Sequence, residues 1–295
     1  MATLPFVSII TVNYNQTAVT CDLLDSLTVS VTCFSQFEII VVDNGSQHSC
    51  EPVINRNYPH VRVVSSETNL GSAGGVNLGL RIARGDYFML LDNDTKVSPD
   101  FLLPLVNAMQ QHPDVGICAA KIRSYEKPEY IQFAGSTPLH PLRMAPQLIG
   151  NGHKDEGQFD QEGYTHHVHG AALLVRREAV NRAGVMPEEY FLYYQEVEWC
   201  ERIKQAGFRI YFVPESVVYH KGSVSLSKTS AFQVYYKTRN RILLARRWRR
   251  GPGRWVTLSY LCLITFRDIL AYTYAGKIPQ RVGCWEAVKW HLVNR

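Results

Sequence analysis

The chain has 295 residues, of which 46% are hydrophobic and 19% are charged, enough for one large globular domain or one domain with a smaller appendage. Its seven cysteines are scattered and form no CxxC pair or zinc-ligand spacing, which favours a reducing compartment over a secreted, disulfide-stapled protein. The net charge of +5 conceals an asymmetry, because residues 216–295 contain 15 Lys/Arg against 2 Asp/Glu.

The first part of the chain alternates predicted strands with predicted helices. Short segments rich in Val, Ile and aromatic residues are apolar on both faces, as buried parallel strands are, at residues 6–12, 37–43, 61–65 and 87–92. Helices are predicted between them at residues 17–30 and 74–84. The alternation predicts an α/β fold with a mainly parallel sheet, whose ligand site lies beyond the carboxyl ends of the strands.

The second part is less regular. Helices are predicted at residues 99–111 and 195–206, and strands at residues 115–119, 170–176 and 209–213. The polar stretch 124–164, rich in Pro, Gly and His, is expected to form long loops that shape an acceptor site.

Three polar clusters fall where predicted strands end: Asp-Asn-Gly-Ser at 43–46, Asn-Leu-Gly at 69–71 and Asp-Asn-Asp at 92–94. For any single cluster, a simple turn after the strand is as good an explanation as a ligand site. Three clusters in register with successive strands indicate a ligand site. The carboxylates of Asp92 and Asp94 could together hold a hard divalent cation and a ribose or diphosphate oxygen, because Mg and Mn prefer oxygen ligands. Such a metal offsets the charge that builds on a departing diphosphate.

Taken together, these motifs resemble family 2 glycosyltransferases with the GT-A fold, especially the rhamnosyltransferase-like and galactofuranosyltransferase-like branch. The resemblance extends over roughly residues 5–245 and rests on residues 7–15, 41–46, 69–71 with Asn77, and 91–94. It implies a Rossmann-like, mainly parallel sheet flanked by helices.

The resemblance also implies a role for each matching residue. Asp94 would bind the metal, Asp92 would contact ribose or diphosphate, and Asn69 would lie near the nucleotide. The nucleoside base would be held by Thr11, Asn15 and Asp43. The remaining residues assigned to substrate binding are Gly71, Asn77, Asn93, Glu198 and Trp199.

Residues 190–202 resemble the acidic catalytic segment of this family, which usually reads Glu-Asp or Asp-Asp, one residue, Asp. Here Gln195 replaces the first acid, and Glu196 and Glu198 replace the aspartates. Glu196 aligns with the catalytic base. A nucleoside diphosphate leaves as a stable anion, so only the acceptor hydroxyl needs proton removal, and one base gives single displacement with inversion. The alternative is that these acids form the solvated start of a helix.

His220 follows a strand-like stretch, and a lone histidine is more often a structural hydrogen-bonding residue than a ligand. The family comparison favours a ligand, because the matching histidine completes the metal site with the residue that matches Asp94. By contrast, we interpret His166, His167 and His169 as partly exposed and partly structural rather than as a metal cluster.

Residues 229–295 are predicted to form a basic, amphipathic helical tail. The apolar run 255–266 is interrupted by Arg267 and Asp268, so it is expected to be too short to span a bilayer. Basic residues with interspersed aromatics suit an anionic membrane surface, and no nucleic-acid module is recognised. The alternatives are packing on the catalytic domain and self-association into an oligomer.

The sequence therefore predicts an inverting, metal-dependent glycosyltransferase that uses Mg or Mn. Its catalytic domain would cover residues 1–228, with a nucleotide-sugar-binding half at about 1–120 and an acceptor half at about 121–228. The expected donor is dTDP-rhamnose or a UDP-sugar, and the expected acceptor is a glycan or lipid-linked glycan of an O-antigen-like surface polysaccharide. We expect a cytoplasmic protein on the inner face of the cell membrane, because the amino terminus lacks the layout of a signal peptide.

Two alternative functions remain open at this point. A nucleotidyltransferase also uses paired carboxylates and a metal, but the chain lacks an evident basic, Gly-rich triphosphate loop near its start. A non-catalytic membrane scaffold that keeps a sugar-nucleotide fold would explain the altered Gln195-Glu196 pair.

Overall fold

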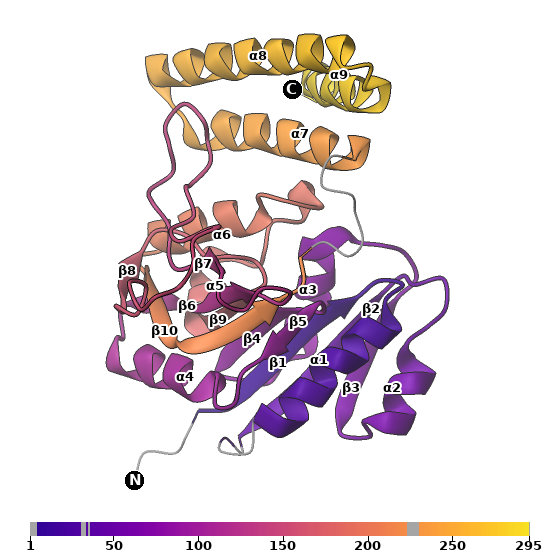
Figure 1. Cartoon of the computed structure of the whole chain (residues 1–295), viewed down its shortest axis with the longest axis vertical. Helices are drawn as coiled ribbons and strands as arrows, with labels where there is room; N and C mark the ends of the chain where they lie inside the picture. The colour runs from indigo at the N-terminus through magenta and orange to yellow at the C-terminus, as the bar shows by residue number, and fades with distance from the viewer. Residues whose placement is uncertain (1–4, 31–33, 35, 223–229, 295) are drawn as a thin grey trace.

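The computed structural model describes residues 5–30, 34, 36–222 and 230–294. These residues form an α/β unit built on a twisted sheet, with a group of helices at one end (Figure 1). The predicted boundary between residues 228 and 229 lies outside the described residues.

The sheet has strand order β3-β2-β1-β4-β9-β6-β10-β5. Four strands at one side are parallel, as the sequence predicts: β1 (Val7–Asn13), β2 (Phe37–Asn44), β3 (Val61–Ser66) and β4 (Tyr87–Asp92). Antiparallel β9 (Ala172–Arg176) separates them from the parallel pair β6 (Val115–Ser124) and β10 (Arg209–His220). The sheet is therefore mixed, and short strands complete it: β5 (Thr95–Val97), β7 (Ile131–Phe133) and β8 (Gly163–Thr165).

Helices flank the sheet and bury its apolar strands in one continuous core. They are α1 (Thr17–Ser30), α2 (Glu51–Asn57), α3 (Gly71–Ile82), α4 (Leu102–Gln111), α5 (Arg177–Ala183), α6 (Gln195–Gln205) and the short 3₁₀ helix η1 (Glu188–Tyr190). Gly79 of α3 lies against β1, where an added Cβ would come within 2.5 Å of the Ile10 side chain. This close approach explains why a glycine is present in the middle of a helix.

Several predicted boundaries differ from the structure, and two of these differences have a clear local reason. The helix predicted to begin at residue 74 begins at Gly71, whose N–H donates to the side chain of Asn69. The strand predicted to end at residue 213 continues to His220, because β10 passes Pro214 through an irregularity in its pairing with β6. The second difference matters most, since it places His220 at the end of a strand.

The helical tail consists of α7 (Ala231–Trp248), α8 (Gly251–Tyr274) and α9 (Ile278–Val293), which pack together beyond α6 (Figure 1). The long loop after β7 joins this group, since Met144 packs in a small second core with Leu244 and Leu261. The tail is therefore in contact with the catalytic part through both α7 and this loop.

Helix α8 corrects one expectation from the sequence. It continues through Arg267 and Asp268 and has 24 residues, so by length and composition alone it is able to cross a membrane. Only 17% of its apolar window is buried. The prediction that this segment is too short to span a bilayer was thus wrong about the helix length.

A strained segment leads into α6. Phe191, Tyr193 and Tyr194 have positive φ angles of 50°, 64° and 72°, a conformation that costs free energy for residues other than glycine. The side-chain nitrogen of Asn240 on α7 lies 2.8 Å from the carbonyl oxygens of Tyr190, Leu192 and Tyr193. Asn240 is fully buried, so these hydrogen bonds stabilise the segment from the tail.

We expect Asn240→Ala to lower the free energy of unfolding by about 1–3 kcal/mol, because it leaves buried carbonyl groups without donors. Chemical denaturation measures the change. Asn181→Ala is the matched control, since Asn181 is exposed on α5. Equal stabilities of the two variants would contradict the anchoring role of Asn240.

Candidate functional site

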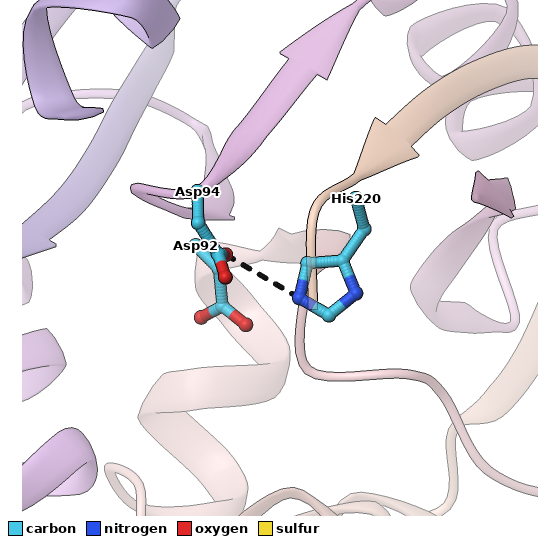
Figure 2. A group of neighbouring side chains, drawn as sticks. All are labelled: Asp92, Asp94 and His220. Atoms are coloured by element: carbon cyan, nitrogen blue, oxygen red, sulfur yellow. Dashed lines mark ion pairs between the residues drawn. The ribbon is translucent and has the colours of Figure 1, made fainter. Parts of the chain in front are cut away.

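Asp92, Asp94 and His220 form the centre of the site (Figure 2). Asp92 ends β4, Asp94 lies in the turn before β5, and His220 ends β10. The antiparallel pairing of β5 with β10 sets Thr95 opposite His220, which brings the preceding Asp94 alongside the imidazole. One ligand atom from each residue lies within 4.8 Å of the others, and Nε2 of His220 is 3.3 Å from Oδ1 of Asp94.

Gln132 on β7 orients the imidazole of His220. The side-chain nitrogen of Gln132 donates to the backbone carbonyl of His220 at 3.0 Å, and this fixes the orientation of the amide. Its oxygen then lies 2.7 Å from Nδ1 of His220, and an amide oxygen can only accept, so the proton is on Nδ1. In the neutral imidazole, Nε2 therefore has the lone pair and lies beside the carboxylate of Asp94, whereas in the imidazolium Nε2 donates to Asp94.

The charges of this cluster affect one another. Burial lowers the pKa of His220, but the hydrogen bond and negative charge of Asp94, with the charge of Asp92, outweigh burial and raise it. Loss of solvent around Asp92 and the neighbouring charge of Asp94 raise the pKa of Asp92. Two carboxylates held so close together are costly without a cation.

The donor set fits a divalent metal. Two carboxylates suit Mg or Mn, and an imidazole nitrogen with a free lone pair suits Mn better than Mg. Among the described residues, this group is the one that brings ligand atoms together closely enough to share an ion.

Glu196 and this cluster line the same cavity of about 400 Å³. Its lining includes Asp92, Asp94 and His220, together with Gln195 and Glu196 at the start of α6. Oε2 of Glu196 is buried without a hydrogen-bond partner. Burial, together with the charge of Asp92, raises the pKa of Glu196 to about 7, despite a hydrogen bond from its own backbone N–H. A carboxyl group with this pKa can accept a proton near neutral pH.

Glu196 also lines a second cavity of about 380 Å³. The walls of this cavity come from α7, α8, α9 and the loop at Ala145 and Pro146. Tyr193 is shared by the two cavities as well. The start of α6 therefore stands between two spaces, one next to the carboxylate cluster and one under the tail.

The structure brings some of the predicted site residues together. The first cavity includes Asp92, Asn93, Asp94, Glu196 and His220 in its lining. The amide of Asn93 is within hydrogen-bond distance of Thr20 and Gln16 on α1, so its side chain is directed partly away from the carboxylates.

Three predicted residues lie near the carboxyl ends of β1 and β3. Asn15 is exposed, has a φ of 55°, and accepts a hydrogen bond from the backbone of Gln47. Asn69 accepts from the N–H of Gly71, whose φ is 75°. An added Cβ at Gly71 would lie 2.5 Å from the carbonyl oxygen of Phe191, so this glycine permits α3 to approach the strained segment.

Of the other predicted substrate-binding residues, all but Thr11 have structural contacts, and Oγ1 of Thr11 is buried without a hydrogen-bond partner. Asp43 is buried and accepts from Asn13 and from the backbone of Cys50, and these contacts lower its pKa although burial raises it. The side-chain amide of Asn77 binds the backbone of Met186 twice: its nitrogen donates to the carbonyl and its oxygen accepts from the N–H. Five of the residues that were assigned to substrate binding are buried, and this assignment stays a prediction. They are Thr11, Asp43, Asn77, Glu198 and Trp199.

Glu198 and Trp199 illustrate such a structural role. The buried carboxylate of Glu198 pairs with Arg202 at 2.6 Å and with Arg247 of α7 at 3.1 Å. The fully buried Trp199 donates to the carbonyl of Gly184 at 2.8 Å. These contacts fix α6 against its neighbours and thereby fix the position of Glu196.

Sequence reasoning missed several residues of the site. Gln132 lies in the irregular stretch after β6, where no periodic pattern singled it out. His169 lines the first cavity, with its ring centroid 5.3 Å from that of His220, and burial followed by the charge of His220 lowers its pKa to about 3. His166 is exposed, and His167 is buried with Nε2 2.8 Å from Glu201.

Comparisons with known proteins agree with this geometry. A model of the family described as Glycosyl transferase family 2 matches residues 8–184. The N-acetylglucosaminyl-diphospho-decaprenol L-rhamnosyltransferase of Mycobacterium tuberculosis is 26% identical over 258 residues, which cover 76% of this chain and 81% of that protein. The dTDP-rhamnosyl transferase RfbF of Shigella flexneri is 22% identical over 220 residues, 71% of each chain.

Solved structures share the fold at low identity. The mannosyltransferase PcManGT from Pyrobaculum calidifontis, in complex with GDP-Man and Mn²⁺, superposes with a TM-score of 0.59 at 16% identity, over 99% of this chain and 88% of that chain. GalNAc-T7 with UDP, GalNAc and Mn²⁺ gives a TM-score of 0.67 at 16% identity over 84% of this chain, which spans only 49% of that chain. Both likenesses confirm the predicted GT-A fold. Because the family model covers more than half of its residues, the chain belongs to glycosyl transferase family 2, an inverting hexosyltransferase family, and is a glycosyltransferase.

Proposed function

We propose that the enzyme transfers a rhamnosyl group from dTDP-rhamnose, with inversion, onto a hydroxyl of a lipid-linked glycan during assembly of a cell-surface polysaccharide. One observation carries the proposed chemistry: a carboxylate–imidazole cluster and Glu196, whose Oε2 is buried without a hydrogen-bond partner, line one cavity. The choice of rhamnose rests on the names of the relatives from M. tuberculosis and S. flexneri.

In the proposed reaction, Glu196 removes the proton from the acceptor hydroxyl as the oxygen attacks the anomeric carbon. The base and the departing diphosphate lie on opposite faces of the sugar, so the displacement inverts the anomeric centre. Asp92, Asp94 and His220 would hold a divalent metal, which when bound offsets negative charge on the diphosphate. Gln195, the first residue of α6, and Tyr193, two residues before it, line the same cavity beside Glu196.

The first prediction concerns Glu196. Release of nucleoside diphosphate from dTDP-rhamnose, with acceptor and metal, should fall by roughly 10²- to 10⁴-fold in Glu196→Gln, because the amide cannot accept the proton. Binding of the nucleotide sugar should change little. Unchanged turnover in this variant would remove Glu196 as the base.

The second prediction is a pH dependence. Since Glu196 acts in its deprotonated form and its pKa is raised to about 7, kcat/KM should rise with pH through about 7 and level off above it. The profile is measured as initial rates at saturating metal, in a series of buffers from about pH 5.5 to about pH 8.5. A profile that is flat across neutral pH would contradict the buried base.

The third prediction concerns metal binding and uses no turnover. Isothermal titration with Mn²⁺ should show binding to the full chain and its loss in Asp94→Asn and His220→Ala. Gln132→Ala should weaken binding roughly 10- to 100-fold, because Gln132 orients His220. His166→Ala is the control, since His166 is exposed. If the Asp94 and control variants bind Mn²⁺ equally well, the metal site lies elsewhere.

We further propose that the tail rests on the cytoplasmic surface of an anionic membrane. Thr257, Leu261 and Thr265 are buried and lie on one face of α8, four residues apart. Exposed apolar side chains of α8 and α9 support lipid contact: Trp255, Val256, Leu263, Phe266, Leu270, Ile278, Val282 and Trp285. A helix packed along one face and apolar elsewhere suits the membrane interface, and the excess of basic residues suits anionic lipid.

The fourth prediction tests this surface by flotation. The full chain should float with vesicles that contain phosphatidylglycerol and should float less with pure phosphatidylcholine vesicles. Phe266→Glu should weaken flotation, and the control Val53→Glu, on exposed α2, should not. Wild-type protein that ignores anionic vesicles at low salt, or that forms a dimer dissociated by Phe266→Glu, would contradict the membrane proposal.

A further inference from the structure

The lining of the cavity under the tail does not include Asp92, Asp94 or His220, yet Glu196 forms part of its wall. It is enclosed by Tyr193 and Tyr194 from the strained segment, by Lys237 and Arg241 from α7, and by Asp268 and Tyr272 from α8. A molecule in this cavity therefore has the proposed base at one side and a group of charged and aromatic side chains at the other.

Two cations in this cavity differ from the other basic residues of α7. Arg239, Arg246 and Arg247 are engaged with protein oxygen atoms on Glu189, Asn294 and Glu198. Within the described part of the chain, Lys237 and Arg241 form no ion pair, and Nε of Arg241 is buried without a hydrogen-bond partner.

Neither cation forms an ion pair with Glu196 or Asp268, the two acids that line the cavity with them. Lys237 lies over the ring of Tyr193, with Nζ 4.8 Å from the centroid, and burial lowers its pKa. The carboxylate of Asp268 also lines the cavity, but it pairs with Arg267 at 2.7 Å. Lys237 and Arg241 are four residues apart on one helix, so both present their charge to the same space.

We propose that this cavity binds the phosphate-bearing part of the acceptor, with Lys237 and Arg241 contacting its phosphate oxygens and the sugar held near Glu196. This inference rests on the proposed transfer to a lipid-linked glycan, and it adds the chemical class of the acceptor's anchor and the two residues that recognise it. A guanidinium and an ammonium give the charge-assisted hydrogen bonds that phosphate requires. Tyr193 and Tyr194 offer rings against which a sugar face can pack.

The position of the cavity agrees with this assignment. It lies between the catalytic part and helices α8 and α9, whose outer faces carry exposed apolar side chains. An acceptor with a lipid chain, a phosphate and a sugar would then extend from the apolar surface, past the two cations, to Glu196.

Direct binding of butyl diphosphate tests the inference without knowledge of the acceptor sugar. The full chain is titrated calorimetrically in EDTA, so that no metal holds the diphosphate at Asp94 and His220. Wild-type protein should bind, and Arg241→Gln and Lys237→Gln should each weaken binding roughly tenfold or more, because each removes a charge-assisted contact. Two variants serve as controls and should bind like wild type: Arg250→Gln, on the exposed residue before α8, and Asp94→Asn, in the metal cluster.

Three results would overturn the inference. The first is no binding to the wild-type chain, and the second is binding that persists in Arg241→Gln and Lys237→Gln but disappears in Asp94→Asn. The third is inorganic pyrophosphate binding as tightly as butyl diphosphate, which would indicate a site for the free anion rather than for a linked acceptor. The proposed function is tested separately, by release of nucleoside diphosphate and by Mn²⁺ binding, and none of these three results bears on those two measurements.

Discussion

The position of the proposed base depends on a group of backbone carbonyls held by a buried amide. Phe191, Tyr193 and Tyr194 have positive φ angles that side-chain-bearing residues avoid, and Asn240 donates to the carbonyl groups of Tyr190, Leu192 and Tyr193 in the same segment. The ion pair of Glu198 with Arg247 adds a second attachment between α6 and α7. Together with the hydrogen bond from Trp199 to Gly184, these contacts hold the first turn of α6, and with it Glu196, in place.

Glu196 is placed where two cavities meet, and this placement suits a displacement reaction. The first cavity contains the metal-binding side chains, and the second contains the cations of α7. Burial and the charge of Asp92 raise the pKa of Glu196 to about 7, and among the described residues its Oε2 has no hydrogen-bond donor that would oppose this rise. A hydrogen-bonded carboxylate at the same place would be a weaker base, because donors favour the charged form.

The sequence predicted the parts of the site that depend on local pattern. Buried strands with carboxylates at their ends are visible as apolar runs followed by acids, and the order of motifs identified the family, which in turn linked Asp94 to His220. Gln132 could not be predicted in this way. It lies on the short strand β7 and contacts His220, which is 88 positions further along the chain. The buried settings of Asp43 and Asn77 were equally invisible, since hydrogen bonds to nearby backbone leave no periodic trace. The length of α8 was misjudged because Arg267 and Asp268 pair with each other and do not end the helix.

Fixation of the strained segment by α7 has a consequence for exchanging the tail. Asn240 of α7 binds the backbone of the segment before Glu196, and Arg247 of α7 binds the carboxylate of Glu198, so α7 is structurally part of the reaction centre. A chimera that joins residues 5–222 to the tail of a relative needs equivalent amide and guanidinium groups, or its first turn of α6 loses its register.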